Sequence, residues 1–170
     1  MNEELKNGLE KAAADIKNIN IPTWDELPSF ELYMDQVITL INEYLDVMRD
    51  NEDEGVITKN MINNYVKMKI MPPPVRKKYS RLHIAYLIII CMLKQIFSIS
   101  VINSILISDA EPEEITRIYT AFASNVRKAA DIDISKYAKD GVASEESCVI
   151  RFSAEAIILK TLAEKIIKNA

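Results

Sequence analysis

The side chains best suited to chemistry lie on a short predicted helix that begins after Thr58, whose hydroxyl would cap its first turn and position it. Helical spacing puts Ile62, Tyr65 and Val66 on the packed face, so the opposite face carries only amides and ammonium groups. Asparagine can read adenine through paired hydrogen bonds, and lysine can reach guanine or a phosphate. This exposed face predicts contacts with DNA, and a polar surface helix without a ligand is the alternative. Its residues are Lys59, Asn60, Asn63, Asn64 and Lys67.

A second group of cations follows Pro72, Pro73 and Pro74, which must end the helix because proline pushes the preceding residue out of the helical region. The basic connector Val75 to Tyr79 predicts a wing or loop against the phosphate backbone, which supplies much of the affinity for nucleic acids. An ordinary solvated loop is the alternative. The full set of predicted DNA contacts is Thr58, Lys59, Asn60, Asn63, Asn64, Lys67, Arg76, Lys77, Lys78, Tyr79 and Arg81.

The charge of the chain is uneven, although the net charge is only −4. Residues 1–54 hold 4 basic and 14 acidic side chains, and residues 109–170 hold 9 and 11. Between them, residues 55–108 hold 8 basic side chains and no acidic one. A basic window in an acidic protein is typical of an anion-binding face, with chance clustering as the alternative.

The composition argues against an enzyme and against a resident metal or cofactor. The 170 residues contain one histidine, His83, which excludes histidine-cluster metal sites and makes most hydrolytic triads improbable. Three glycines leave little room for phosphate-cradling loops. Asp50 to Gly55 resembles the start of a calcium loop, but Met61 stands where the twelfth position needs a carboxylate. Cys91 and Cys148 lack other metal-ligating side chains at suitable spacing, so no cofactor is expected.

Apolar residues recur at helical spacing along most of the chain, which predicts an all-α fold with at most a short hairpin near residues 75–79. A loop is expected at residues 19–29, Ser29 is expected to cap the second helix, and residues 131–151 fit no single element. The expected helices cover residues 1–17, 29–48, 58–70, 80–97, 98–106, 111–126 and 153–168.

No secretory signal opens the chain, and the longest apolar run, Ile84 to Leu93, is half of what a membrane-spanning helix needs. We therefore expect a cytoplasmic protein without a membrane segment. The last predicted helix, residues 153–168, is apolar over more of its surface than one core-facing stripe requires. This breadth predicts a homodimer formed through the C-terminal region.

The order of elements from Ile57 to Ile102 resembles the winged helix-turn-helix of MerR-like regulators. In those proteins a recognition helix ends in two apolar residues and two prolines, and a basic wing with a tyrosine follows. Here Ile70 to Pro73 match the helix exit and Tyr79 matches the wing tyrosine. Asn63 and Asn64 stand where that superfamily usually has arginine and tyrosine, and Lys69 replaces its glycine.

A more specific resemblance is carried by the segments at residues 32–37, 57–59, 61–67, 72–75, 77–80 and 83–84. Over residues 25–125 the chain resembles the domain of unknown function 1836 family of Gram-positive bacteria. It implies a cytoplasmic bacterial protein with a MerR-like core, and it implies no established function.

Together these features predict an all-α helical bundle around a MerR-like winged helix-turn-helix, with flanking N- and C-terminal helices. Residues 1–24 would form an N-terminal arm and linker, residues 25–110 the DNA-binding domain, and residues 111–170 a C-terminal region that pairs the subunits. The expected function is sequence-specific binding of double-stranded DNA as a transcriptional regulator. The alternative is a non-enzymatic helical module that docks an acidic partner through its basic face, which the pI near 5.2 favours.

Overall fold

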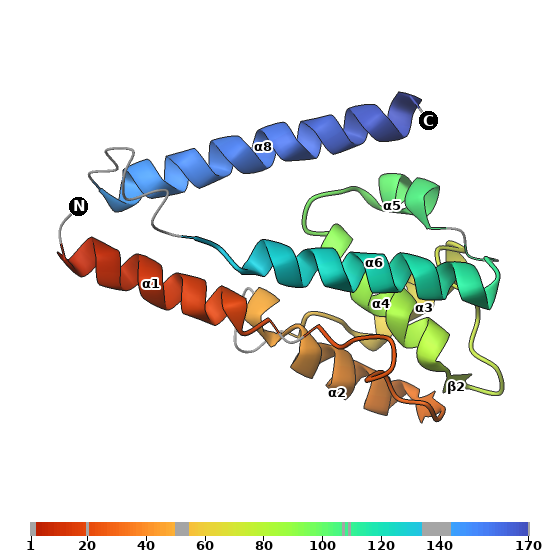
Figure 1. Ribbon diagram of the computed structural model, residues 1–170. Coiled ribbons are helices and arrows are strands. Elements are labelled where there is room, and N and C mark those ends of the chain that lie inside the picture. Colours follow the sequence, from red (N-terminus) through yellow and green to blue (C-terminus); the bar gives the residue numbers. More distant parts are fainter. Residues whose placement is uncertain are drawn as a thin grey trace. The chain divides into compact units, whose positions relative to one another are not determined.

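The computed structural model of the protein describes residues 3–19, 21–49, 55–106, 108, 110–133 and 144–169. The chain divides into a central unit, Ile19–Lys128, and a terminal unit made of Met1–Asn18 and Ala129–Ala170. Helices make up most of the described residues, and the one sheet they contain pairs two strands of two residues each (Figure 1). The predicted all-α class is confirmed. The predicted domain divisions after residues 24 and 110 stay a prediction.

The central unit begins with a strand and a helix that the sequence places differently. We predicted that Ser29 caps the second helix, but α2 starts only at Met34, where the Tyr33 N–H donates to Gln36 Oε1 at 2.9 Å. Residues 32 and 33 are extended instead, because they pair in antiparallel register with Tyr79 and Lys78. The elements are β1 (Leu32–Tyr33), α2 (Met34–Tyr44), the 3-10 helix η1 (Asp46–Met48), α3 (Lys59–Lys67), β2 (Lys78–Tyr79), α4 (Arg81–Leu93), α5 (Ile99–Ile105) and α6 (Pro112–Ala130).

Helix α4 forms the centre of this core. Every residue from His83 to Cys91 is buried, as expected of a helix that is apolar on all sides. It begins where predicted, after Ser80, whose backbone N–H donates to His83 Nδ1 at 3.0 Å. Buried side chains from α2, α3, α5 and α6 complete the core, among them Ile41, Ile62, Ile102 and Tyr119.

The segment before β1 is tied to α6 by two hydrogen bonds. The Tyr119 hydroxyl donates to the Pro22 carbonyl at 2.8 Å, and Arg127 donates to the Ile21 carbonyl at 2.7 Å. The Trp24 ring meets Tyr119 edge-on, with the ring centroids 6.0 Å apart. These contacts explain why α6 belongs to the central unit.

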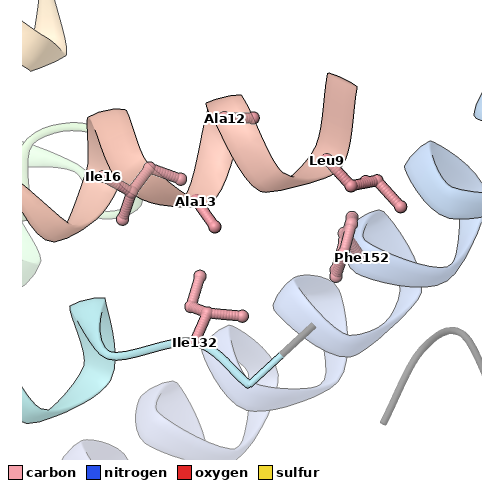
Figure 2. Close-up of a pocket in the computed structure, with 6 residues that line it drawn as sticks. All are labelled: Leu9, Ala12, Ala13, Ile16, Ile132 and Phe152. Atoms are coloured by element: carbon pink, nitrogen blue, oxygen red, sulfur yellow. The ribbon is translucent and has the colours of Figure 1, made fainter. Parts of the chain in front are cut away.

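The terminal unit contains α1 (Glu3–Lys17) and α8 (Glu145–Asn169), so the last helix begins eight residues before its predicted start. Leu5 of α1 and Cys148 of α8 are buried together, with Leu9 and Phe152 beside them. This unit contains an apolar cavity of about 340 Å³. Figure 2 shows the side chains of α1, Ile132 and Phe152 that line it. None of the described helices is both long and apolar enough to cross a membrane.

Candidate nucleic-acid interface

Helix α3 begins at the predicted residue and buries the predicted apolar face. Thr58 is the N-cap, and its hydroxyl oxygen accepts a hydrogen bond from the Met61 N–H at 3.4 Å. Ile62 and Tyr65 are buried, and Val66 is half-buried. The opposite face is fully polar, carries no acidic residue, and is exposed over Lys59, Asn60, Asn63, Asn64 and Lys67.

The start of α3 is held in place by side chains from two other parts of the central unit. Asn42 of α2 brackets the backbone of Ile57: its Oδ1 accepts from the Ile57 N–H at 3.1 Å, and its Nδ2 donates to the Ile57 carbonyl at 3.4 Å. Lys94, just after α4, donates to the Val56 carbonyl at 2.8 Å. These hydrogen bonds fix the backbone just before α3 to α2 and to the end of α4, and the polar face of α3 stays exposed.

Helix α3 ends in a Schellman motif, in which the residue after the C-cap is normally glycine because it takes a left-handed conformation. The Ile70 N–H donates to the Tyr65 carbonyl and the Lys69 N–H to the Val66 carbonyl, both at 3.0 Å. The left-handed residue here is Lys69, with φ of 56° and an exposed side chain. The sequence analysis notes that Lys69 replaces a glycine of the MerR-like regulators, but it does not include Lys69 among the predicted DNA contacts. That replacement was the signal in the sequence that could have identified it as a site residue.

The predicted hairpin after the three prolines is present. Val75 and Lys78 exchange backbone hydrogen bonds of 3.1 and 2.9 Å, and β2 then pairs with β1. The two residues of the turn, Arg76 and Lys77, have φ of 50° and 66°. Both side chains are exposed, and both residues come directly before β2 in the sequence. Two successive positive φ values are typical of a type I′ turn, which asparagine and glycine normally occupy.

All the non-glycine residues with positive φ in the described part of the chain are therefore cations, namely Lys69, Arg76 and Lys77. A residue with a Cβ in the left-handed region costs about 1–2 kcal/mol relative to ordinary backbone, and glycine avoids most of that cost. Strain of this kind concentrates at functional sites, where another requirement outweighs it. What the three residues share is a positive charge held at the surface.

Lys78 and Arg81 are placed differently from the other predicted phosphate contacts, because both are half-buried and engaged with the protein itself. Lys78 Nζ lies 3.6 Å from a Glu31 carboxylate oxygen and 5.8 Å from the centroid of the Tyr33 ring. Arg81 donates to the Pro28 carbonyl at 3.5 Å, with its guanidinium carbon 5.6 Å from the Trp24 ring centroid. Both cations therefore connect the wing region to the segment before α2.

Tyr79 was expected to contact DNA, but only 2% of its surface is exposed. Its strand pairs with Leu32, and its ring meets His83 edge-on with centroids 5.5 Å apart. Burial also raises the pKa of its hydroxyl. Because strand pairing turns this side chain into the core, we leave Tyr79 out of the candidate interface.

His83 links the connector to the start of α4. Its Nδ1 accepts from the Ser80 N–H, so the ring proton belongs on Nε2, which lies 3.2 Å from the Pro73 carbonyl and donates to it. Burial lowers the pKa of this histidine, against the raising effect of the Pro73 hydrogen bond. A neutral His83 thus accepts a hydrogen bond from the Ser80 N–H, which follows the wing, and donates one to the Pro73 carbonyl, which precedes it.

The candidate interface consists of the exposed residues of α3 and of the wing. Within the described parts of the chain, none of its five cations pairs with a carboxylate. The calcium-like stretch at residues 50–54 lies outside the described residues, and among the residues that the structure does describe no three potential ligands gather for a metal ion. The members of the interface are Thr58, Lys59, Asn60, Asn63, Asn64, Lys67, Lys69, Arg76 and Lys77.

Comparison with known proteins gives one match. No curated protein and no solved structure matches the chain. A family model described as Domain of unknown function (DUF1836) matches residues 22–122, which is more than half of the 170 residues and includes the whole candidate interface. This match confirms the family resemblance predicted from the sequence. The chain belongs to the family named Domain of unknown function (DUF1836).

Proposed function

We propose that the protein binds double-stranded DNA in a sequence-specific manner and regulates transcription. The observation that carries this proposal is the placement of Lys69, Arg76 and Lys77 at three left-handed backbone positions around α3. Each position would be more stable with glycine or asparagine, so the cations need a reason outside the folded chain. A polyanion that lies along α3 and the wing supplies that reason.

The order of elements supports the same function. A strand, two helices, a hairpin that pairs with the first strand, and a further helix follow each other from β1 to α4. This order fits the MerR-like winged helix-turn-helix that the sequence resembles, with α3 as the recognition helix and the hairpin at residues 75–78 as the wing. The absence of acidic residues from 55 to 108 removes repulsion of a phosphate backbone from this region.

The two groups of side chains would have different roles in the complex. Amides on α3 would read base edges in the major groove, where asparagine pairs with adenine. The lysines of α3 and the two wing residues would contact phosphates, which fix the position of the protein but carry no base identity. We assign base reading to Asn60, Asn63 and Asn64, phosphate binding to Lys59, Lys67, Lys69, Arg76 and Lys77, and positioning of α3 to Thr58.

A recognition helix of nine residues covers only a few base pairs, so we expect two chains to bind two half-sites together. Lys78 and Arg81 would support the wing through their contacts with residues before α2 rather than serve as primary phosphate contacts.

The decisive experiment measures binding to a mixed pool of genomic DNA fragments at several salt concentrations, followed by selection of preferred sites. Five phosphate contacts per chain predict a slope of log affinity against log salt of roughly −4 to −5 per bound chain. Absence of DNA binding at low salt, with salt-sensitive binding of poly-glutamate instead, would overturn the proposal in favour of an acidic protein partner. A selected site rich in adenine would support base reading by the three asparagines.

A further inference from the structure

The imidazole of His83 connects the two arms of the wing, which are residues 73–75 before the turn and residues 78–80 after it. Its Nδ1 accepts a hydrogen bond from the Ser80 N–H at 3.0 Å, and its Nε2 donates to the Pro73 carbonyl at 3.2 Å. Only 6% of the surface of His83 is exposed, so both hydrogen bonds are shielded from water. A side chain of α4 therefore holds together two backbone segments that flank the wing turn.

The register of the hairpin explains why a side chain is needed at this position. Val75 pairs with Lys78, so Pro73 would lie opposite Ser80 if the antiparallel ladder continued. In that ladder the Ser80 N–H would donate to the Pro73 carbonyl, and the N–H of residue 73 would donate back. Proline has no N–H, so this pair cannot close in full. The imidazole lies between the same N–H and the same carbonyl, and it completes the ladder with one acceptor and one donor.

We propose that neutral His83 holds the wing in its DNA-binding position and that protonation of the imidazole releases the wing. This inference rests on the proposed function and names a regulation of that same interface. A neutral imidazole has one acceptor and one donor, which match the Ser80 N–H and the Pro73 carbonyl. A protonated imidazole has two donors, so its Nδ1 proton would face the Ser80 N–H. The Ser80 hydroxyl oxygen, 2.9 Å from Nδ1, can accept the new proton, but the Ser80 N–H then loses its acceptor.

The two wing cations depend on this link for their position. Arg76 and Lys77 form the turn, which is closed by the Val75 and Lys78 backbone hydrogen bonds of 3.1 and 2.9 Å. The arm after the turn is also fixed by pairing with β1. A two-stranded hairpin is marginally stable by itself, and this one contains two strained left-handed residues. Without the His83 link, the cations therefore lose their fixed position against a phosphate backbone.

The groups around the ring decide at which pH it is neutral. Burial lowers the pKa of His83, whereas the backbone carbonyl that it contacts and the negative charge of Glu31 raise it. Glu31 is itself paired with Lys78 at 3.6 Å, and the Tyr79 ring meets the imidazole edge-on. Arg81, two positions earlier on α4, donates to a backbone carbonyl before β1. Burial outweighs the effects that favour the charged form, so the ring is neutral at pH 7.5 and gains its proton below its usual pKa of 6.5.

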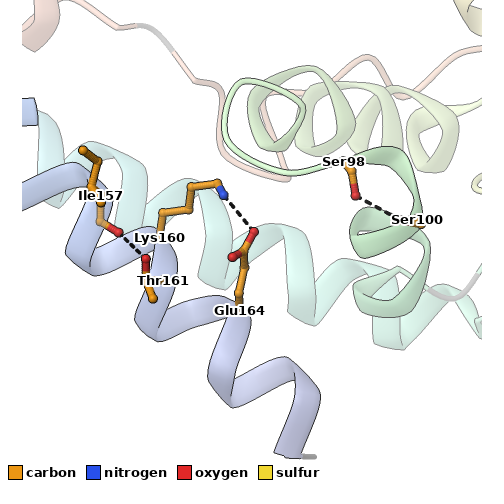
Figure 3. A network of polar contacts seen from close by, with 6 residues as sticks. All are labelled: Ser98, Ser100, Ile157, Lys160, Thr161 and Glu164. Carbon is orange, nitrogen blue, oxygen red and sulfur yellow. Dashed lines mark hydrogen bonds and ion pairs between the residues drawn. The ribbon is translucent and has the colours of Figure 1, made fainter.

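Few other groups of this chain change charge between pH 7.5 and 5.5. The sequence contains no second histidine. Lys160 donates to Glu164 at 2.8 Å in α8, as Figure 3 shows, and this hydrogen bond holds the pKa of Glu164 below its usual 4.5. Hydrogen bonds from Thr23 lower the pKa of Glu26 in the same way. A change in wing behaviour over this pH range therefore reports the charge of His83.

The first test uses the full-length protein without DNA, so it is independent of the proposed function. At pH 7.5, the nitrogen chemical shifts of the single imidazole should show a protonated Nε2 and an unprotonated Nδ1. The Val75 and Lys78 N–H groups, which donate within the wing, should exchange with solvent at least about tenfold faster in His83→Leu than in the native protein. His83→Gln should keep slow exchange, because its amide retains one acceptor and one donor.

The matched control for lost stability is Ile88→Ala. It truncates a fully buried side chain of the same helix, and it should leave the exchange of the wing unchanged. The opposite tautomer, or equal exchange of the wing in His83→Leu and the native protein, would overturn the proposal.

The second test measures the slope of log affinity for DNA against log salt. His83→Leu should reduce this slope by about 1.8, because Arg76 and Lys77 each account for about 0.9, whereas Ile88→Ala should keep the native slope. In a variant that carries both Arg76→Ala and Lys77→Ala, the further change His83→Leu should have no effect on the slope. The native slope should also decrease from pH 7.5 to 5.5, and the slope of His83→Gln should not.

Two results of this second test would overturn the proposal. One is an effect of His83→Leu on the slope that persists without the wing cations, and the other is an equal change with pH in the native protein and in His83→Gln. Absence of DNA binding by the native protein would instead overturn the proposed function. The tautomer and the exchange rates would then still decide whether His83 holds the wing.

Discussion

Replacing Lys77 by glycine should stabilise the central unit and weaken its binding to DNA. Lys77 has φ of 66° in the turn of the wing, where a side chain costs about 1–2 kcal/mol. Glycine removes that strain but gives the unfolded chain more freedom, which returns about 0.4–1 kcal/mol. The expected net gain is about 1 kcal/mol in the free energy of unfolding. For a unit of this size, such a gain raises the melting temperature by roughly 4 °C.

The same substitution removes one exposed cation from the candidate interface. One lost phosphate contact should reduce the slope of log affinity against log salt by about 0.9, and at 0.1 M salt this corresponds to roughly a tenfold loss of affinity. The loss should be the same for preferred and unrelated DNA sequences, because a phosphate contact carries no base identity. Stability and binding should therefore change in opposite directions.

The free energy of unfolding is measured by urea titration, with the fluorescence of Trp24 as the probe, since this is the single tryptophan and it lies in the central unit. Affinity is measured by fluorescence anisotropy of labelled DNA at several salt concentrations. Lys77→Ala is the matched control: it removes the same charge and keeps a Cβ, so binding should weaken without the gain in stability. If Lys77→Gly is no more stable than the native protein, the reasoning about strain is refuted. If it is more stable but binds DNA equally well, the strain does not serve DNA binding.

Three further predictions concern bases, protons and thiols. Asn63→Ala or Asn64→Ala should cost about 1–3 kcal/mol on the preferred DNA site and relax selection at one or two base pairs, and unchanged selection would show that α3 does not read bases. Burial holds the pKa of His83 below its usual 6.5, so the native state resists protonation. The free energy of unfolding should therefore fall as the pH drops below about 6.5. Urea titrations should show a smaller fall between pH 7.5 and 5.5 for His83→Gln than for the native protein. Burial raises the pKa of the Cys91 thiol to about 12 and Cys148 is also buried, so the melting temperature should be equal with and without reductant, and a drop of many degrees would indicate a thiol role not seen in the fold.

Much of the candidate interface followed from the sequence because its signals are local. A threonine before a polar-apolar repeat predicts the start of α3, and three prolines predict its end within a few residues. The exposed face of α3 follows from helical spacing alone, because the apolar residues must turn toward a core wherever that core lies. Ser80 is a local signal of the same kind, and it predicts the start of α4. The family match also fell where the sequence placed it.

The tertiary structure decided which residues around α3 remain exposed and able to contact a ligand. Tyr79 and Lys78 are neighbours in the sequence of the wing, yet one is buried and the other is half-buried beside Glu31, because β2 pairs with residues more than forty positions earlier. The same pairing moved the start of α2 from Ser29 to Met34. No local pattern near residue 79 contains that information.

The left-handed backbone conformations of Lys69, Arg76 and Lys77 could likewise be known only from the folded structure. Lys69 is left-handed because Ile70 must turn back into the core, where it is fully buried, and Arg76 and Lys77 are left-handed because the wing must reverse direction within two residues. A sequence with lysine or arginine at these positions predicts no such turn, since glycine or asparagine is the usual signal. Local propensity determined where the helices begin and end, whereas pairing between distant segments determined which charges reach the surface and at what cost to the backbone.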